Sequence, residues 1–302
     1  MSNWHLFAIS TAIWGSTWLV ITFQLGVVAP EVSVAYRFAL ASAMVFAWCR
    51  VRRVPLRYPL REHLWFSGLG VCAFGLNYVL VYRAESLVTS GLVAMVFALI
   101  VFLNPALARV AFGTPVTVRL AAGATLGVVG TALLFRREAG GASPATLGVV
   151  LSVASMLVAV LGNLIAQRNE RAGVPTLAGL AWGMLYGAAA VAAWALATGV
   201  PWRIELTAAY LASLVYLALF GSVIAFAAYF TLLGRVGPGP SAYVAVVCPV
   251  IALVLSAAFE GYRWSVEGAT GVVLIVAGMV LSMAGAGRAG RGWRGWLRPR
   301  RG

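Results

Sequence analysis

Long apolar runs recur along the chain, separated by short polar stretches. A transmembrane helix needs about 20 apolar residues to cross the ~30 Å hydrocarbon core of a bilayer. Ten runs have about this length: Trp4–Phe23, Val32–Arg50, Leu64–Tyr82, Thr89–Arg109, Thr117–Phe135, Ala145–Gln167, Thr176–Ala197, Thr207–Thr231, Pro240–Phe259 and Val266–Gly285. They are apolar on all sides, whereas the strands of a transmembrane barrel alternate. The pattern therefore predicts an all-α membrane protein of ten transmembrane helices.

Composition supports this prediction. Hydrophobic residues make up 62% of the 302 positions and charged residues 10%, whereas a soluble domain is about half apolar and a quarter charged. The N-terminus shows neither the basic region nor the cleavage site of a signal peptide, so the first run is expected to remain as a span. Ten spans would leave about 100 residues for connections, which must be short.

The net charge of +14 arises from 22 basic residues, all arginine. In a soluble chain this excess would suggest a protein that binds nucleic acid. Here, however, most arginines lie outside the predicted spans, in the connections and the C-terminal tail. If the N-terminus is cytoplasmic, sixteen lie on inner segments and five on outer ones. The positive-inside rule then places both termini in the cytoplasm. We expect no nucleic-acid partner, and expect the basic tail, residues 288–302, to lie at anionic lipid headgroups.

The two halves of the chain are related by a shift of 148 residues. This shift superposes Gly113 on Gly261, Val118 on Val266, Gly123 on Gly271, Gly130 on Gly278 and Leu133 on Leu281. Five helices is an odd number, so the second half must enter the membrane from the opposite side. The prediction is two inverted five-helix repeats, residues 1–140 and 141–287, an architecture found in many secondary transporters.

Several motifs carry a family resemblance. They are Ile13-Trp14-Gly15-Ser16, Tyr36-Arg37-Phe38, the segment Gly237-Pro-Gly-Pro-Ser-Ala-Tyr243, Pro249, Phe259-Glu260-Gly261 and the spaced Gly268, Gly271 and Gly278. Together they resemble the EamA-type members of the drug/metabolite transporter superfamily, and most of all the YddG-type exporters of aromatic and other amino acids. The resemblance implies a multi-pass carrier of the bacterial inner membrane that needs no cofactor and acts as a monomer or homodimer.

Charged groups are scarce inside the predicted spans. Only Arg37 lies clearly within one; it could reach headgroups or pair with Glu31, or it could capture a substrate carboxylate at the outer mouth. No acidic residue falls near the centre of a span, which argues against a buried proton relay. No catalytic residues or metal ligands are expected, because no carboxylate pair, metal-ligand spacing or activated nucleophile is present.

The remaining candidates for a site are aromatic or neutral and polar. The predicted substrate-binding residues are Trp14, Asn77, Tyr78, Tyr82, Asn163, Phe226, Tyr229 and Tyr243. A mostly apolar pocket with few polar groups suits a small ligand. The alternative is that the aromatic side chains pack against neighbouring helices, or that Tyr82 belongs to an interfacial belt.

The segment before the ninth span has two interpretations. Gly237, Pro238, Gly239 and Pro249 are candidate gating or hinge residues. The same glycines fit a tight turn, with Pro240 in the first turn of a helix. The leading functional hypothesis is an exporter of aromatic or apolar amino acids or related metabolites that works by alternating access. The alternatives are an exporter of drugs or other hydrophobic metabolites, and a membrane scaffold or receptor that transports nothing.

Overall fold

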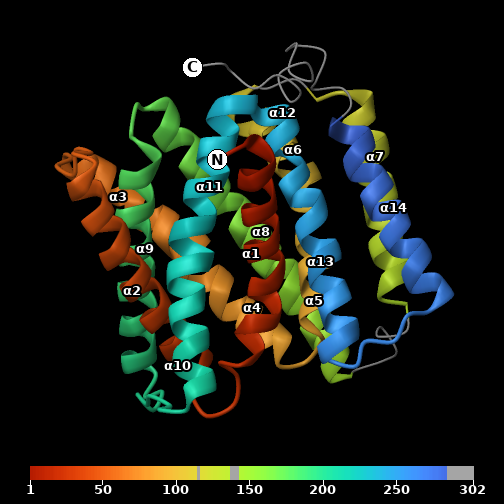
Figure 1. Ribbon diagram of the computed structural model, residues 1–302, viewed down its shortest axis with the longest axis horizontal. Coiled ribbons are helices and arrows are strands. Elements are labelled where there is room, and N and C mark those ends of the chain that lie inside the picture. Colours follow the sequence, from red (N-terminus) through yellow and green to blue (C-terminus); the bar gives the residue numbers. More distant parts are fainter. Residues whose placement is uncertain (114–115, 137–142, 284–302) are drawn as a thin grey trace. The chain divides into compact units, whose positions relative to one another are not determined.

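The computed structural model describes residues 1–113, 116–136 and 143–283, and within these ranges it is all helical, with no strand (Figure 1). The predicted basic tail, 288–302, lies outside the described residues. Eight described helices are long and apolar enough to cross a membrane: Asn3–Thr22 (α1), Pro30–Val51 (α2), Leu60–Glu85, Ser90–Phe112, Pro144–Arg171 (α8), Thr176–Ala197 (α9), Ala208–Val236 and Val266–Met283 (α14).

The other two predicted spans are shorter apolar helices. Val118–Leu134 (α7) and Tyr243–Phe259 (α13) contain 17 residues each, which corresponds to about 25 Å of helix. This length is at the lower limit for crossing the hydrocarbon core. The all-helical membrane-protein class predicted from the sequence is thus confirmed.

The third and eighth predicted spans each contain a π-helical segment. In the third, η1 (Gly70–Leu76) joins α3 (Leu60–Leu69) to α4 (Asn77–Glu85). In the eighth, η2 (Tyr216–Ile224) joins α10 (Ala208–Val215) to α11 (Ala225–Val236). The shift of 148 residues carries η1 onto 218–224, so both π-helical segments occupy corresponding positions in the two halves. Such segments are rare and often occur at functional sites.

Prolines shape the fourth and ninth predicted spans. The fourth is divided into α5 (Ser90–Phe97) and α6 (Ile100–Phe112), with Pro105 inside α6. A proline ring clashes with the carbonyl four residues earlier, which bends the helix on its N-terminal side. The ninth begins with a short helix, α12 (Pro238–Ser241), ahead of α13, so the regular helix starts three residues later than Pro240.

The chain forms two compact units, and each unit combines segments from both halves of the sequence. Unit 1 comprises Met1–Leu19 and the described parts of Val88–Thr146 and Ile224–Gly302, and unit 2 comprises Val20–Leu87 and Leu147–Val223. The boundaries fall inside α1, α8 and η2, so these helices contribute residues to both units.

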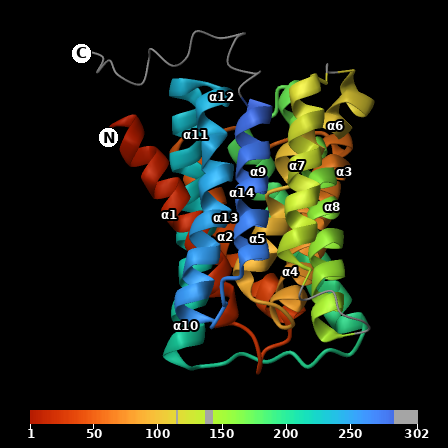
Figure 2. The same ribbon diagram turned by 90° about the vertical axis from the view of Figure 1, so that its right-hand side faces the viewer.

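In unit 1, α7 and α14 lie side by side (Figures 1 and 2). A Cβ atom added at Gly278 would lie 2.5 Å from the carbonyl oxygen of Gly123, and one added at Gly271 would lie 2.5 Å from that of Gly130. The two backbones can approach this closely only because these positions carry no side chain. The order of the two contacts makes the helices antiparallel.

In unit 2, α9 packs along α2 and η1. A Cβ atom at Gly70 would lie 2.5 Å from the carbonyl oxygen of Gly183, so this contact also depends on glycine. The Ser42 hydroxyl on α2 donates to the Ala181 carbonyl on α9 at 2.9 Å. These contacts hold α2, η1 and α9 together.

Candidate functional site

An aromatic cluster in unit 1 joins α1 to α11. The ring of Trp14 lies 5.0 Å from that of Phe226 and 5.2 Å from that of Tyr229, and Phe226 stacks on Phe230 at 5.8 Å. The four rings are half-buried. Edge-to-face and offset-stacked rings pack favourably, and such rings also suit an aromatic ligand. Three of the predicted binding residues thus meet in one place.

The candidate hinge residues and Tyr243 also lie in unit 1. Gly237 ends α11 with φ +79°, a backbone conformation that favours glycine. Pro238 and Gly239 lie in α12, Tyr243 is the first residue of α13, and Pro249 is buried within α13. The tight turn is therefore present, whereas the gating role stays a prediction.

Asn77 connects α4 to α8 in unit 2. Its Oδ1 atom accepts a hydrogen bond from the Ser155 hydroxyl at 2.8 Å, and its Nδ2 group donates to the Ala73 carbonyl at 3.2 Å. Asn163, two turns further along α8, is exposed. Both Asn77 side-chain atoms thus have protein partners in this conformation, so a substrate would have to replace one of these bonds.

We expect Asn77 and Ser155 to be energetically coupled. A double-mutant cycle of Asn77→Ala and Ser155→Ala, measured by unfolding in detergent, should give a coupling energy of about 0.5–1.5 kcal/mol, typical of polar pairs between membrane helices. Ser152 is the matched control, because its hydroxyl bonds within α8 to the Gly148 carbonyl. Equal coupling of Asn77 to both serines would contradict the expectation.

Arg37 is the most deeply buried charge in the described part of unit 2. Its side chain is 2% exposed, and the guanidinium carbon lies 4.6 Å from the Tyr78 ring centre and 5.1 Å from that of Phe38. The expectation that Arg37 reaches headgroups is wrong, because the residue is enclosed. Pairing with Glu31 is wrong too, because the Glu31 carboxylate accepts a hydrogen bond from Arg83 instead.

Tyr82 lies next to this arginine, one turn after Tyr78. Its hydroxyl donates to the Oε1 atom of Gln24 at 2.8 Å and interacts electrostatically with both Arg37 and Glu85. Tyr82 is fully buried, so an interfacial-belt position is wrong for it. Tyr78, Tyr82 and Glu85 follow i, i+4, i+7 spacing and share one face of the helix.

Nitrogen atoms in this cluster lack acceptors. In the described part of the chain, Nε and Nη1 of Arg37 and Nε2 of Gln24 are buried without a hydrogen-bond partner. Gln24 is 1% exposed and Glu85 6%. A buried donor without an acceptor costs about 1–3 kcal/mol, and more for a charged group.

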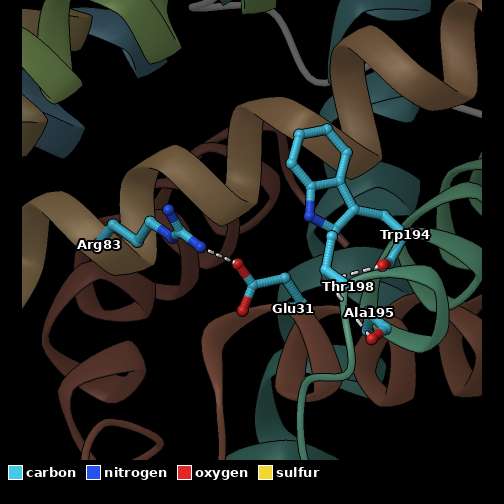
Figure 3. Close-up of polar contacts among 5 residues, drawn as sticks. All are labelled: Glu31, Arg83, Trp194, Ala195 and Thr198. Atoms are coloured by element: carbon cyan, nitrogen blue, oxygen red, sulfur yellow. Dashed lines mark hydrogen bonds and ion pairs between the residues drawn. The ribbon is translucent and has the colours of Figure 1, made fainter.

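A separate apolar groove of about 200 Å³ lies on unit 2 between the η1–α4 segment and α9. Its walls include Val71, Leu76 and Val191, and Glu31, Arg83 and Trp194 also line it. Figure 3 shows the ion pair between Arg83 and Glu31. The Thr198 hydroxyl caps the end of α9 by donating to the Trp194 carbonyl at 2.8 Å. The groove can hold an apolar chain or ring, and it contains none of the predicted binding residues.

Glu260 ties α13 to the first turn of α5 in unit 1. Its Oε1 atom accepts from the backbone N–H of Ser90 at 3.1 Å, and its Oε2 atom accepts from the Ser90 hydroxyl at 2.5 Å and from the Ser256 hydroxyl. The Ser256 oxygen in turn accepts from the Gly91 N–H at 2.8 Å. A carboxylate at a helix N-terminus is favourable, so the glutamate of the Phe259-Glu260-Gly261 motif has a structural role.

Gln24 and Glu85 lie just beyond the ends of the first and third predicted spans, so the sequence indicates connections there and not a buried cluster. Glu85 follows Tyr82 by one turn of the same helix, whereas the contact of Gln24 with Tyr82 depends on how the segment between α1 and α2 lies against α4. The one sequence feature that points to Gln24 is that this polar residue directly follows the first predicted span. Among the described residues, no three His, Cys, Asp or Glu side chains are grouped so that they could hold a metal ion.

Comparison with known proteins identifies the family. The model of the EamA-like transporter family matches the chain twice, over residues 2–136 and 146–284. The chain belongs to the EamA-like transporter family. These two matches cover both halves of the chain, including the aromatic cluster, Arg37 and Glu260.

Two curated relatives of this EamA-like protein come from Escherichia coli (strain K12). The uncharacterized inner membrane transporter YedA is 29% identical over 254 residues, covering 82% of this chain and 80% of the relative. A probable amino-acid metabolite efflux pump is 24% identical over 283 residues, covering 90% and 92%. Both names denote transporters, not enzymes. The EamA-like protein is thus a multi-pass inner membrane protein of a transporter family.

A crystal structure with 20% sequence identity superposes with a TM-score of 0.68, covering 94% of this chain and 97% of its own. At this identity the likeness supports the fold alone. The EamA-like fold described here is therefore shared with a solved structure over nearly its whole length.

Proposed function

We propose that this protein exports amino acids, chiefly aromatic or apolar ones, or related small metabolites across the inner membrane. The observation that carries the proposal is the half-buried cluster of Trp14, Phe226 and Tyr229, which offers ring faces and edges to a planar apolar side chain. The relative named as a probable amino-acid metabolite efflux pump supports the same substrate class.

We further propose that the two repeats, 1–140 and 141–287, are inverted. Transport then proceeds by alternating access between these two halves. The reciprocal contacts of Gly123 with Gly278 and of Gly130 with Gly271 support this arrangement, because the shift of 148 residues exchanges one pair for the other. With both termini in the cytoplasm, the arginine-rich segments face anionic lipids of the inner leaflet.

Efflux from proteoliposomes tests the function. Vesicles containing the full-length protein and loaded with labelled phenylalanine should release the label faster than protein-free vesicles. Trp14→Phe should retain this activity, whereas Trp14→Ala should raise the KM. We expect release to persist without an imposed proton gradient, because the predicted spans have no acidic residue near their centres. Vesicles that release no member of an amino-acid panel would contradict the proposal.

A second candidate function is export of hydrophobic compounds, and the apolar groove of unit 2 favours it. Export of an apolar dye without export of any amino acid would identify this alternative. Absence of transport for every compound would instead favour a scaffold or receptor.

A further inference from the structure

The apolar groove of unit 2 forms where α9 leaves the η1–α4 segment. α9 packs closely along η1, where a Cβ atom added at Gly70 would lie 2.5 Å from the Gly183 carbonyl oxygen, but its contact with α4 is slight. Gly75 and Ala190, which have little or no side chain, line the space between the two helices. The groove therefore follows from the way these helices pack.

The groove extends from the end of a membrane-spanning helix to about its middle. Val71, Leu76, Leu80 and Arg83 line it on one side. Val71 lies near the middle of the Leu60–Glu85 helix, and Arg83 lies two residues before its end. This stretch corresponds to about 18 Å of helix, which is close to the ~15 Å of hydrocarbon in one leaflet of a bilayer. Because Val71 and Leu76 are exposed, the groove is open to the acyl chains.

Polar groups line the groove at the level of the helix end. The Arg83 side chain is 52% exposed, whereas that of its partner Glu31 is 4% exposed (Figure 3). A guanidinium has five N–H donors and matches the geometry of a phosphate, so an arginine fixed by one carboxylate can still donate on its exposed side. Trp194, which is also exposed, lies three residues before the end of α9. Tryptophan is typical of the headgroup level.

We propose that this groove binds a phospholipid of the bilayer, with one acyl chain between α4 and α9 and the phosphate at Arg83. Glu31 holds the guanidinium in place, so that the phosphate meets a donor of fixed position. With both termini in the cytoplasm, as proposed above, the lipid belongs to the outer leaflet. It binds the folded protein and contacts two helices, so it stabilises unit 2. The inference does not depend on which substrate is exported.

The first test asks whether the phosphate is recognised. Native mass spectrometry of the purified full-length protein measures the binding of phosphatidylethanolamine and of diacylglycerol with the same acyl chains. The wild type should bind one phosphatidylethanolamine at least about tenfold more tightly than diacylglycerol, as expected for hydrogen bonds to a charged group. The double variant Arg83→Gln with Glu31→Gln should lose this preference, and it leaves no buried carboxylate without its partner.

The second test asks whether the acyl chain lies in the groove. Ala190→Phe should fill the groove and weaken phosphatidylethanolamine binding at least about tenfold, because excluding even two CH₂ groups has this effect. Ala189→Phe is the matched control, since Ala189 is exposed on the same helix and does not line the groove. Added phosphatidylethanolamine should raise the unfolding temperature of the wild type and of Ala189→Phe, but not that of Ala190→Phe. The unfolding temperatures without lipid show whether each variant is folded.

The contrary outcomes are distinct. If the wild type binds phosphatidylethanolamine and diacylglycerol equally, or if both phenylalanine variants bind phosphatidylethanolamine as the wild type does, the inference is overturned. If Ala190→Phe instead blocks export of an apolar dye while lipid binding is unchanged, the groove is a route for hydrophobic substrates, which also overturns the inference. In each case the proposed export of amino acids stands or falls separately, through Trp14→Ala and the efflux of labelled phenylalanine.

Discussion

Gly278→Ala is expected to lower the stability of the protein by about 1–3 kcal/mol, the usual cost of overpacking a close contact. The new Cβ would lie 2.5 Å from the Gly123 carbonyl oxygen and 3.1 Å from the Cβ atom of Leu126. A backbone oxygen cannot turn aside as a flexible side chain can, so α7 and α14 must separate. Thermal unfolding in detergent measures the loss.

Gly179→Ala is the matched control for this prediction. Gly179 is buried in α9, and a Cβ atom there would meet nothing within 4 Å. Alanine also favours a helix over glycine by about 0.5–1 kcal/mol, so this variant should equal or exceed the wild type in stability. The same chemical change should therefore have opposite signs at the two positions. Similar losses at both would show that backbone contact between α7 and α14 is not the cause.

The second large effect is expected at Glu260. Glu260→Ala removes the acceptor of the Ser90 N–H, the Ser90 hydroxyl and the Ser256 hydroxyl. Because partly buried donors are then left without an acceptor, the free energy of unfolding should fall by about 2–3 kcal/mol. The loss is local, so hydrogen exchange at the amides of Ser90 and Gly91 should accelerate more than exchange in the middle of α13.

Two comparisons make the Glu260 prediction specific. Glu260→Gln keeps one carbonyl oxygen but loses the charge at the start of α5. Its stability should therefore lie between those of the wild type and the alanine variant. Glu205→Ala removes another hydroxyl-accepting glutamate, since Glu205 accepts from Thr207 at 2.8 Å on the exposed surface. Glu205→Ala should change the free energy of unfolding by no more than about 0.5 kcal/mol. An equal loss for Glu205→Ala and Glu260→Ala would contradict the role of Glu260.

The membrane class and most helix positions could be predicted because they depend on local composition. A run of about 20 apolar residues has few alternatives to a helix. The cluster of Trp14, Phe226 and Tyr229 could be predicted in part for a related reason. Helical spacing places each of these residues on one face of its helix together with other aromatic residues. Which faces meet depends on packing, and the sequence alone left open whether these residues bind a substrate or only each other.

Arg37 illustrates what could not be predicted. Glu31 lies six residues before Arg37 on the same helix, and residues six apart do not face each other, so the partner of each is decided by neighbouring helices. Arg83 takes that carboxylate instead, and this depends on how α4 lies against α2. The π-helical segments were equally inaccessible, because a change from i→i+4 to i→i+5 hydrogen bonding requires no particular residue type.

The π-helical segment η1 determines the direction, around the helix axis, in which the side chains of α4 point. An α-helix turns by about 100° per residue, so one residue fewer between Leu69 and Asn77 would rotate Tyr78 and Tyr82 together away from Arg37. The length of this segment, rather than the identity of its residues, therefore aligns the two tyrosines with Arg37. A relative that keeps all of these residues but lacks one position in this stretch would present a different face of the helix to α2.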